Sequence, residues 1–521
     1  MIHHSAFPDV EIPAHPLTTF VFAQAAERAD QPAFIDGPSG RVVTYGELVD
    51  SIQRLAGGLV AKGFGPGHVL AIMAPNVPDY AVVFHGVAMT GGTITTVNPT
   101  YTSHEVHHQL TDAGATILVT VPMFVDTARA AAVDTKVEEI FVLGGDADGD
   151  ADTQPFSVLM GEPLLEHVAV DLDDVVVLPY SSGTTGLSKG VMLTHRNLVS
   201  NIVQVVGPAE LSDSDTIVAV LPFFHIYGMQ VLMNCGLTAG ATIVTMPRFD
   251  LAEFLQLHQD HGITRSFVAP PIVVALAKHP SVDDFDLSKL VQVFSGAAPL
   301  SADLAVEAGA RLGCEIVQGY GMTELSPVTH LTPPGGFKPG SVGVTVPNTE
   351  MMILDPATGE QLGIEADGEV CVRGPQVMKG YLNNPTATES TIDRDGWLHT
   401  GDVGRVDADG HLYIVDRLKE LIKYKGFQVP PAELEALLLT HPAVADAAVI
   451  GVPDDEAGEI PVGFVALKPG HQATADDIKS FVAERVATYK RLQTVTFVEA
   501  IPKSASGKIL RRLLRDEASA T

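Results

Sequence analysis

The feature that most constrains the fold is a regular alternation of strand-like and helix-like segments up to Gly340. Val69 to Met73 predicts a strand, Asp79 to Met89 a helix, and Thr93 to Val97 another strand. Further strands are expected at Thr216–Val220, Thr242–Met246 and Leu290–Phe294. Because strands separated by helices form parallel sheets with helical crossovers, the sequence predicts an α/β fold.

The pattern changes after Gly340. From there short strands are broken by Asp-Gly pairs at 367–368, 395–396 and 409–410, which indicate hairpins in a small antiparallel unit. A fresh alternation of strands and helices follows Asp416-Arg417-Leu418-Lys419. We therefore expect a large N-terminal domain of parallel sheets (1–416) with a β subdomain at about 341–416, and a small α+β C-terminal domain (417–521).

Composition narrows the function classes. The formal charge of −31 argues against nucleic acid or an anionic membrane as the main partner, because both require clustered cations. Only three cysteines occur, which indicates a reducing compartment rather than a disulfide framework. We find no secretory pattern and no apolar run of about 18 residues, so we expect a cytoplasmic protein without a membrane span. The sequence specifies no oligomeric state.

One segment suggests polyphosphate binding. Ser181-Ser182-Gly183-Thr184-Thr185-Gly186-Leu187-Ser188-Lys189-Gly190 follows an apolar, strand-like run. Glycines let backbone amides turn inward, hydroxyls add donors, and Lys189 supplies a compact cation. Its spacing differs from the common nucleotide-triphosphatase loop, because Leu187 and Ser188 separate Gly186 from the lysine. A flexible surface loop is the alternative for this segment alone.

Three further segments follow in order along the chain. They are Gln318-Gly319-Tyr320-Gly321-Met322-Thr323-Glu324, then Thr400-Gly401-Asp402 with Asp416-Arg417, and finally Pro502-Lys503-Ser504-Ala505-Ser506-Gly507-Lys508-Ile509. With the Ser181–Gly190 loop, this ordered set resembles the adenylate-forming superfamily of acyl-CoA synthetases, luciferases and peptide-synthetase adenylation domains. The resemblance extends over nearly the whole chain. Within it, His225-Ile226-Tyr227, 368–374 and 423–428 are most similar to the 4-coumarate–CoA ligase branch.

The resemblance implies a ligase that uses ATP, Mg²⁺ and coenzyme A. The residues that it assigns to ATP or AMP are Ser181, Ser182, Gly183, Thr184, Thr185, Lys189 and Thr323 for phosphate, Ala297, Ala298, Pro299, Gln318, Gly319 and Tyr320 for adenine, and Asp402 with Arg417 for ribose. Glu324 would hold Mg²⁺, a hard ion that prefers oxygen ligands. Taken alone, Glu324 or Asp402 would more often be a solvated loop acid.

The C-terminal domain would be mobile and would carry residues for both half-reactions. Lys508 matches the lysine that bridges substrate carboxylate and α-phosphate, although without the family match it would be one more tail lysine. Lys419 matches the hinge about which this domain rotates. Lys423 and Gln428 match catalytic residues near the adenylate, and Lys425-Gly426 matches the pantetheine tunnel. The local alternative for this lysine-rich run is an amphipathic surface segment.

The remaining expectations concern the acid and the thiol. His225 would be a gate beside the acyl carboxylate, although a lone histidine in apolar surroundings is usually a core residue. Arg248 matches a position that contacts CoA phosphate, which favours free CoA over a carrier protein. The expected acyl pocket consists of Tyr227, Gln230, Val231, Val268, Pro271, Gly296, Gly321, Pro327 and Val328. Related adenylation domains for amino acids carry an aspartate in this stretch that pairs with the α-amino group. No acid occurs here between Val218 and Cys235, so the resemblance implies a small-molecule carboxylic acid lacking an α-amino group.

Several alternatives stay open at this point. A cinnamate-like aromatic acid is the first choice of substrate, and a medium- or long-chain fatty acid is the second. A luciferase-type oxygenase would share the adenylation step, and a non-catalytic binding module is disfavoured because the phosphate positions are filled. His104-Glu105-Val106-His107-His108 fits the zinc-protease pattern H-E-x-x-H, but it aligns with an ordinary surface helix of the family.

Overall fold

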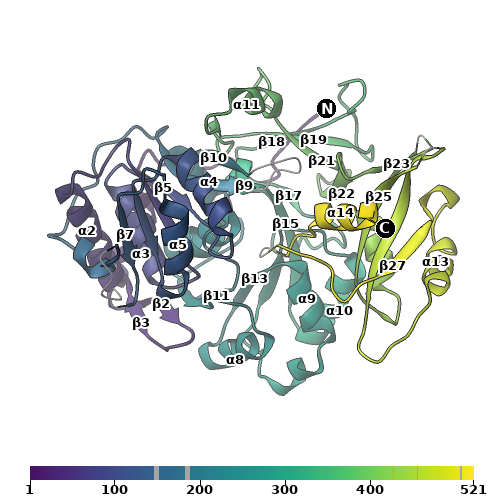
Figure 1. Ribbon diagram of the computed structural model, residues 1–521, viewed down its shortest axis with the longest axis horizontal. Helices are drawn as coiled ribbons and strands as arrows, with labels where there is room; N and C mark the ends of the chain where they lie inside the picture. The colour runs from purple at the N-terminus through teal and green to yellow at the C-terminus, as the bar shows by residue number, and fades with distance from the viewer. Residues whose placement is uncertain (146–151, 182–187, 426, 455, 505–506, 521) are drawn as a thin grey trace.

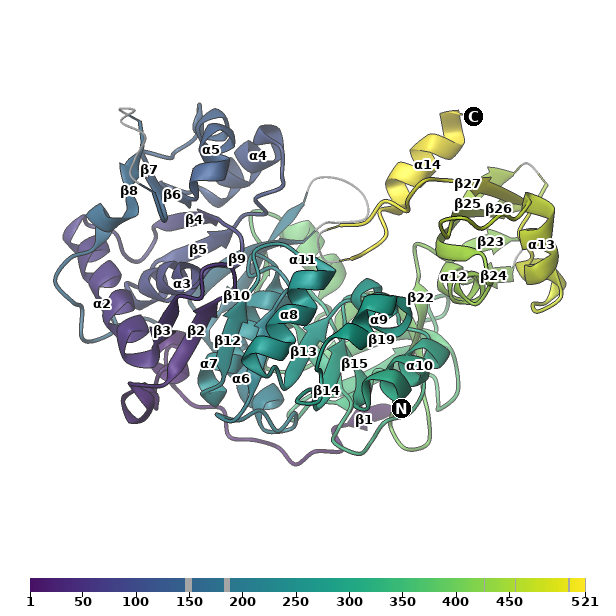
Figure 2. The same cartoon turned by 90° about the horizontal axis from the view of Figure 1, so that it is seen from below.

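The computed structural model describes residues 1–145, 152–181, 188–425, 427–454, 456–504 and 507–520. A large part contains three sheets, and a smaller C-terminal part lies to one side of it (Figure 1). The two parts are seen separately in Figure 2, where the segment before α14 extends from the C-terminal part toward the larger one. None of the helices in the described residues has the length and apolar character that crossing a bilayer requires.

The first sheet has eight strands in the order β20-β10-β9-β5-β4-β6-β7-β8. The strands from β9 to β8 are parallel, and β10 and β20 are added antiparallel at one edge. The bounds are β20 Gly380–Tyr381, β10 Lys189–Thr194, β9 Val175–Ser181, β5 Thr93–Thr96, β4 Val69–Met73, β6 Ile117–Thr120, β7 Glu139–Val142 and β8 Gln154–Pro155.

The second sheet has nine strands in the order β17-β16-β15-β14-β13-β11-β12-β2-β3. It is parallel from β15 to β2 and antiparallel at both edges. The bounds are β17 Val344–Thr345, β16 Val328–Leu331, β15 Glu315–Gly321, β14 Gln292–Ser295, β13 Arg265–Val268, β11 Thr216–Ala219, β12 Thr242–Thr245, β2 Pro32–Asp36 and β3 Val42–Thr44.

The helices of the larger part pack around these sheets (Figure 1). Their bounds are α1 Leu17–Val21, α2 Tyr45–Ala61, α3 Asp79–Met89, α4 Ser103–Ala113, α5 Val125–Ala132, α6 His195–Val206, α7 Gly236–Ala239, α8 Leu251–His261, α9 Pro270–Lys278, α10 Ala302–Leu312 and α11 Pro385–Thr391, with the π-helix η4 at Tyr227–Cys235. π-Helices are rare and are frequently found at functional sites, which makes η4 informative.

The third sheet is antiparallel, in the order β1-β18-β19-β21-β22. Its strands are β1 Ile2–His4, β18 Glu350–Leu354, β19 Gly368–Arg373, β21 Leu398–Val406 and β22 Leu412–Arg417. The N-terminal strand β1 pairs with β18, more than 340 residues away, which the sequence analysis did not anticipate. The remaining strands come from the segment in which an antiparallel unit was predicted.

The C-terminal part contains one sheet in the order β24-β23-β26-β25, with β27 parallel to β26. Its elements are β23 Ile422–Tyr424, β24 Phe427–Val429, α12 Pro431–Leu439, β25 Val444–Asp454, β26 Gly458–Leu467, α13 Ala475–Ala483, β27 Thr494–Phe497 and α14 Arg511–Ala520. The whole chain is thus a mixed α/β structure, as the sequence predicted.

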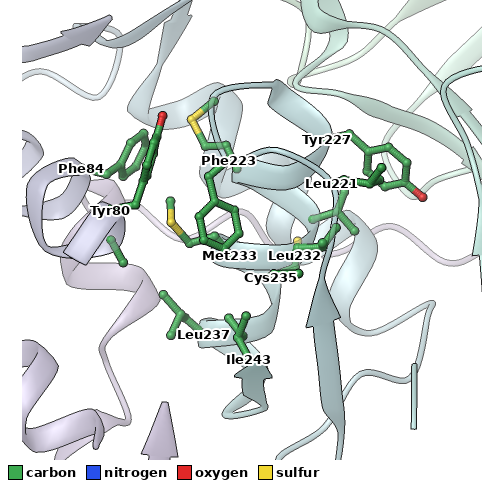
Figure 3. Close-up of a cluster of buried hydrophobic side chains, with 14 of the residues drawn as sticks. Tyr80, Phe84, Leu221, Phe223, Tyr227, Leu232, Met233, Cys235, Leu237 and Ile243 are labelled. Atoms are coloured by element: carbon green, nitrogen blue, oxygen red, sulfur yellow. The ribbon is translucent and has the colours of Figure 1, made fainter. Parts of the chain in front are cut away.

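A buried core connects the two large sheets. Phe223 lies between α3 and η4, with its ring centroid 5.6 Å from that of Tyr80, as Figure 3 shows. Every residue of α3 from Tyr80 to Met89 is buried, so this helix lies inside the protein instead of on its surface. In Figure 3 Tyr227 lies on the opposite side of Leu221 from Tyr80. Packing in the core therefore holds η4 in place, and Tyr227 lies at the edge of this core.

Most predicted boundaries agree with the structure. β4 and α3 have the predicted bounds, and Thr44 and Glu47 form a reciprocal capping box at the start of α2. The Asp409-Gly410 pair forms the predicted turn between β21 and β22, with a φ of 84° at the glycine.

Two details were wrong. Leu290 donates its N–H to the carbonyl of Leu287 in a turn, so β14 begins at Gln292 instead of Leu290. The pair at 367–368 is no hairpin turn, because Gly368 already belongs to β19.

Candidate active site

The predicted phosphate-binding loop connects two antiparallel strands. Ser181 ends β9, Lys189 begins β10, and these two residues are paired in the ladder. Ser182, Gly183, Thr184 and Thr185 lie outside the described residues. The loop is therefore anchored by strands at both ends, whereas the common nucleotide-triphosphatase loop continues into a helix.

Both ends of this loop are connected to the predicted metal ligand Glu324, Lys189 through Tyr381 and Ser181 directly. The Lys189 Nζ lies 4.0 Å from the centroid of the Tyr381 ring, a cation–π contact. The Tyr381 hydroxyl donates a hydrogen bond of 2.8 Å to Glu324 Oε1, and the Ser181 hydroxyl donates one of 3.1 Å to the same oxygen. Burial and the neighbouring Glu324 raise the pKa of Tyr381, so the phenol remains a donor.

The sequence analysis missed Tyr381. Its position follows from the pairing of β20 with β10, in which Val191 is opposite Tyr381. The two strands are separated by almost 190 residues of sequence, and no local pattern marks the tyrosine.

The surroundings of Glu324 fit Mg²⁺. Glu324 is buried, and it follows Thr323 in the short helix η6 (Thr323–Leu325). Both hydrogen bonds from the described residues reach Oε1, which leaves Oε2 for a cation. Mg²⁺ is usually bound by one or two carboxylates together with phosphate oxygens and water, so one free carboxylate oxygen is sufficient.

A second buried carboxylate lies on β21, opposite the last residue of β22. Asp402 is 4% exposed and is paired with Arg417 in the ladder. Its Oδ1 lies 3.0 Å from Arg417 Nε, and its Oδ2 accepts a 2.6 Å hydrogen bond from the Tyr320 hydroxyl. Thr400 Oγ1 accepts the N–H of Asp402. The sequence correctly associated Asp402 with Arg417, and the structure adds Tyr320 to this pair.

The predicted adenine segments lie at the ends of neighbouring parallel strands. Ala297, Ala298 and Pro299 follow β14, and Gln318 and Gly319 belong to β15. Ala297 has a φ of 71°, which marks a sharp change of chain direction directly after the strand. The side-chain oxygen of Gln318 accepts the N–H of Leu300 at 3.3 Å and so connects the two segments.

Lys508 comes from the C-terminal part, and its loop contacts the larger part next to this site. A methyl group on Gly507 would lie 3.1 Å from the Ala269 β-carbon and 3.4 Å from Pro271, so the loop rests against the β13–α9 junction. Burial and Arg417 lower the pKa of Lys508 to about 8, and Asp402 and Glu420 oppose this shift. The predicted catalytic lysine and the predicted ribose pair are therefore electrostatic neighbours.

His225 precedes η4 and is partly exposed. Its Nδ1 accepts the N–H of Tyr227 at 3.3 Å. Burial and the charge of Lys508 lower the pKa of His225 to about 4, so the imidazole is neutral at neutral pH. The structure thus brings His225 and Lys508, predicted for the same active site, into one electrostatic neighbourhood.

Several predicted acyl-pocket residues are connected by direct contacts. A methyl group on Gly296 would lie 2.8 Å from Tyr227 Cε1, and the Gly296 N–H donates to the carbonyl of Val268. Pro271 adjoins the Lys508 loop through Gly507. Gly296 thus contacts both Tyr227 and Val268, and Pro271, three residues after Val268, contacts the loop that carries Lys508.

The other acyl-pocket residues differ in their surroundings. Gly321 is paired with Val328 and packs against Pro327, forming a second small group. Val231 is buried in η4. Gln230 is fully buried, and its side chain bonds to the carbonyl of Leu198 and to Asn234. These hydrogen bonds hold the Gln230 side chain within the packing around η4, and its place in the acyl pocket stays a prediction.

The residues predicted for thioester formation lie elsewhere. Lys423, Lys425 and Gln428 are exposed on the β23–β24 hairpin at the right of Figure 1, and Gly426 lies outside the described residues. Lys419 is exposed in the turn between β22 and β23. Arg248 is exposed directly after β12. The structure therefore does not bring these residues together with Lys508.

The H-E-x-x-H segment lies on α4. The carboxylate of Glu105 accepts hydrogen bonds from the N–H and hydroxyl of Thr102, completing a capping box at the start of the helix. A helix-capping role explains the glutamate without a metal.

Comparison with known proteins identifies the family to which the chain belongs. The model of the AMP-binding enzyme family matches residues 21–382, and that of the AMP-binding enzyme C-terminal domain matches residues 433–508. A 4-coumarate–CoA ligase 3 from Oryza sativa subsp. japonica is 47% identical, with 99% of this chain and 94% of that protein covered. A 4-coumarate–CoA ligase 2 from Petroselinum crispum is 45% identical, with 99% and 96% covered.

Solved structures show the same architecture. An anthranilate CoA ligase in complex with anthranoyl-AMP superposes with a TM-score of 0.91 at 26% identity, covering 98% of this chain and 99% of that one. ATP-bound MatB from Rhodopseudomonas palustris superposes with a TM-score of 0.87 at 30% identity, covering 96% and 98%. With the matches along both parts of the sequence, these findings show that the chain belongs to the AMP-binding enzyme family and, within it, to the 4-coumarate–CoA ligase branch.

Proposed function

We propose that this protein is an ATP-dependent carboxylate–CoA ligase that converts an aromatic acid of the cinnamate type first to an acyl-AMP and then to an acyl-CoA. The observation that carries the proposal is the position of Lys508. Its loop rests against Ala269 and Pro271, and its charge interacts with Asp402 and Arg417. A cation from one domain thereby meets a nucleotide-type site in the other.

The first half-reaction brings two anions together. A carboxylate oxygen of the acid attacks the α-phosphorus of ATP, an O–P bond forms, and pyrophosphate leaves. Preorganised cations and dipoles aimed at developing charge are the strongest catalytic groups for such a step. Lys508 would bridge the acid and the α-phosphate, while Lys189 and the loop that contains Ser182, Gly183, Thr184 and Thr185 would hold the outgoing phosphates.

Other side chains would fix the nucleotide. Asp402, held by Tyr320 and Arg417, would accept the ribose hydroxyls. Ala297, Ala298, Pro299, Gln318 and Gly319 would flank the adenine, and Thr323 would bond phosphate. Mg²⁺ bound at Glu324 would neutralise phosphate charge when present.

In the second half-reaction the CoA sulfur attacks the acyl carbon, a C–S bond forms, and AMP leaves. We propose that the C-terminal domain, residues 417–521, rotates about Lys419 for this step, because its thiol-side residues are exposed in the structure. Rotation would break the Gly507 contact and the hydrogen bond from the N–H of Ala432 to Asp416 Oδ2. The structure then corresponds to the adenylate-forming orientation.

After rotation, the exposed hairpin would approach the adenylate. Lys423 and Gln428 would contact the intermediate, Lys425-Gly426 would line the pantetheine tunnel, and Arg248 would contact CoA phosphate. His225, neutral at physiological pH, would lie at the entry of the thiol without repelling the cation of Lys508.

The acyl pocket favours a flat substrate. Gly296 lies against the Tyr227 ring, and a side chain at this position would collide with the ring. Val231, Val268, Pro271, Gly321, Pro327 and Val328 would complete the walls. Two of the relatives are 4-coumarate–CoA ligases, which supports an aromatic acid over a fatty acid. The three free cysteines support a cytoplasmic location.

A pyrophosphate-release screen tests the proposal. Purified protein is supplied with ATP and Mg²⁺, then with cinnamates, benzoates or fatty acids, each with and without CoA. We expect 4-coumarate or a close analogue to give the highest kcat/KM, with a CoA-dependent thioester product. Preference for a fatty acid would reject the aromatic assignment, and CoA-independent light emission with luciferin would reject the ligase in favour of an oxygenase.

A further inference from the structure

Three side chains that the proposed reaction does not use converge on the third sheet. Glu369 and Cys371 lie on β19, and His399 lies opposite Cys371 on β21. Their ligand atoms are all within 4.8 Å of one another. Cys371 packs with Met352 and Trp397, apart from the cluster that contains Val370, Val372 and Leu398. The strand register therefore places a thiol, an imidazole and a carboxylate together on one face of the sheet.

The sulfur–nitrogen distance in this cluster matches the one expected around a tetrahedral cation. Cys371 Sγ lies 3.5 Å from His399 Nδ1, and Glu369 Oε2 lies 2.9 Å from the same nitrogen. Zinc bonds of about 2.0–2.3 Å in tetrahedral geometry place adjacent ligand atoms roughly 3.3–3.6 Å apart. The sulfur–nitrogen edge already has this length, and the nitrogen–oxygen edge needs only a small opening.

Further groups support the three ligands. Asp393 Oδ2 lies 3.8 Å from His399 Nε2, on the side of the imidazole away from Cys371 and Glu369. A carboxylate behind a metal-bound histidine fixes its tautomer and raises its basicity. Glu369 Oε1 accepts the N–H of Gly401 at 3.1 Å, which orients its other oxygen toward His399. His399 has 31% of its side chain exposed, which gives an ion access from solvent.

A hydrogen-bonded structural cluster is the simpler explanation, and it accounts for only part of the geometry. His399 Nδ1 carries one hydrogen at most, and that hydrogen can serve Glu369 or Cys371 but not both. A bound cation would satisfy all three ligand atoms at once.

We propose that Glu369, Cys371 and His399 bind one divalent cation of the zinc class, with Asp393 orienting the imidazole. On binding, a metal–sulfur bond forms and the thiol proton passes to solvent. Thiolate, imidazole and carboxylate together are characteristic zinc ligands, whereas Mg²⁺ prefers oxygen alone. This site is therefore chemically distinct from the one proposed at Glu324.

Cobalt and zinc titrations of the metal-free, full-length protein test the site. Co²⁺ reports a thiolate ligand through a sulfur-to-metal charge-transfer band, and Zn²⁺ affinity is measured by competition with a chromogenic chelator. We expect one equivalent of metal and a thiolate band in the wild-type protein. Asp393→Asn should weaken Zn²⁺ binding about 10–100-fold, the usual effect of losing a group that supports a ligand.

Variants of the ligands and matched controls decide the outcome. Cys371→Ser should abolish the band, and His399→Gln, at a more exposed position, should weaken Zn²⁺ binding at least as much as Asp393→Asn does. Cys314→Ser removes a thiol elsewhere and His104→Gln alters the H-E-x-x-H segment, so both should bind as the wild type does. The proposal is overturned if the wild-type protein shows no saturable binding, or if the band survives Cys371→Ser.

Discussion

The phosphate end of the candidate site and the β23–β24 hairpin are built in opposite ways. Around Glu324 and Asp402, buried carboxylates are each held by two side chains from distant segments. On the hairpin, Lys423, Lys425 and Gln428 are exposed. Both regions are expected to act in one reaction, yet only the first is assembled in this structure.

This difference between the two regions corresponds to the two half-reactions of the proposed function. Groups that stabilise charge in adenylation are preorganised, and such groups act without rearrangement during the reaction. Under the proposed function, the groups for thioester formation lie on the C-terminal domain and would have to be carried to the adenylate. Substitutions in the first region should therefore impair acyl-AMP formation, and substitutions at the hinge should impair thioester formation.

The largest effect is expected from Lys508→Ala. Losing one preorganised cation costs about 10²–10³ in rate, or about 3–4 kcal/mol, so acyl-AMP formation should nearly cease. Supplied acyl-AMP should still be converted to acyl-CoA. Pyrophosphate release and thioester formation are measured separately, with Lys503→Ala as the control because that lysine pairs with Asp446. Equal loss of both half-reactions would contradict the separation.

The next effect is expected from Tyr381→Phe. The substitution keeps the ring beside Lys189 but removes the hydrogen bond to Glu324. A hydrogen bond to a charged group contributes about 1.5–3 kcal/mol, so adenylation should fall about 10–100-fold. The Mg²⁺ concentration for half-maximal rate should rise. Tyr424→Phe, on the hairpin, is the control, and an unchanged Mg²⁺ dependence of Tyr381→Phe would remove this tyrosine from the site.

Lys419→Pro should impair thioester formation more than adenylation. Proline restricts the backbone torsion that a hinge must change, so thioester formation should slow by about tenfold, which corresponds to about 1.4 kcal/mol. Adenylation should change less, because Lys508 is already in position. Lys419→Ala controls for loss of the charge. If both variants form thioester at the wild-type rate, the hinge does not lie at this residue.

The smallest effect concerns pH. Because the pKa of Lys508 is lowered to about 8, its amine is charged below that pH and becomes neutral above it. Adenylation should therefore decline by several-fold as pH rises from 7 to 9, while conversion of supplied acyl-AMP should decline less. Stopped-flow measurement of each half-reaction across this range gives the comparison. An adenylation rate that is flat or rises with pH would exclude a requirement for charged Lys508.

The elements with strong local signals could be predicted from the sequence. The capping box of Thr44 and Glu47, the apolar run of β4 and the Asp409-Gly410 turn are set by neighbouring residues. The pairing of Asp402 with Arg417 was likewise accessible, because both belong to motifs with recognisable neighbours.

Contacts between distant residues that depend on strand register could not be predicted from the sequence. Tyr381 meets Lys189 because β20 pairs with β10, and Cys371 meets His399 because β19 pairs with β21. Neither register leaves a periodic signal in the sequence. The π-helix η4 was also missed, and it explains why Gln230 bonds within the core although it was expected in the acyl pocket.

The tight seating of Gly507 bears on how substrates come and go. The Gly507 loop lies so close to Ala269 that one added methyl group would crowd it, and under the proposed function this contact between the two parts persists while acyl-AMP is made. Pyrophosphate would then leave, and new substrates would enter, when this contact is broken. We therefore expect that the rotation of the C-terminal domain, proposed for thioester formation, also limits the turnover rate.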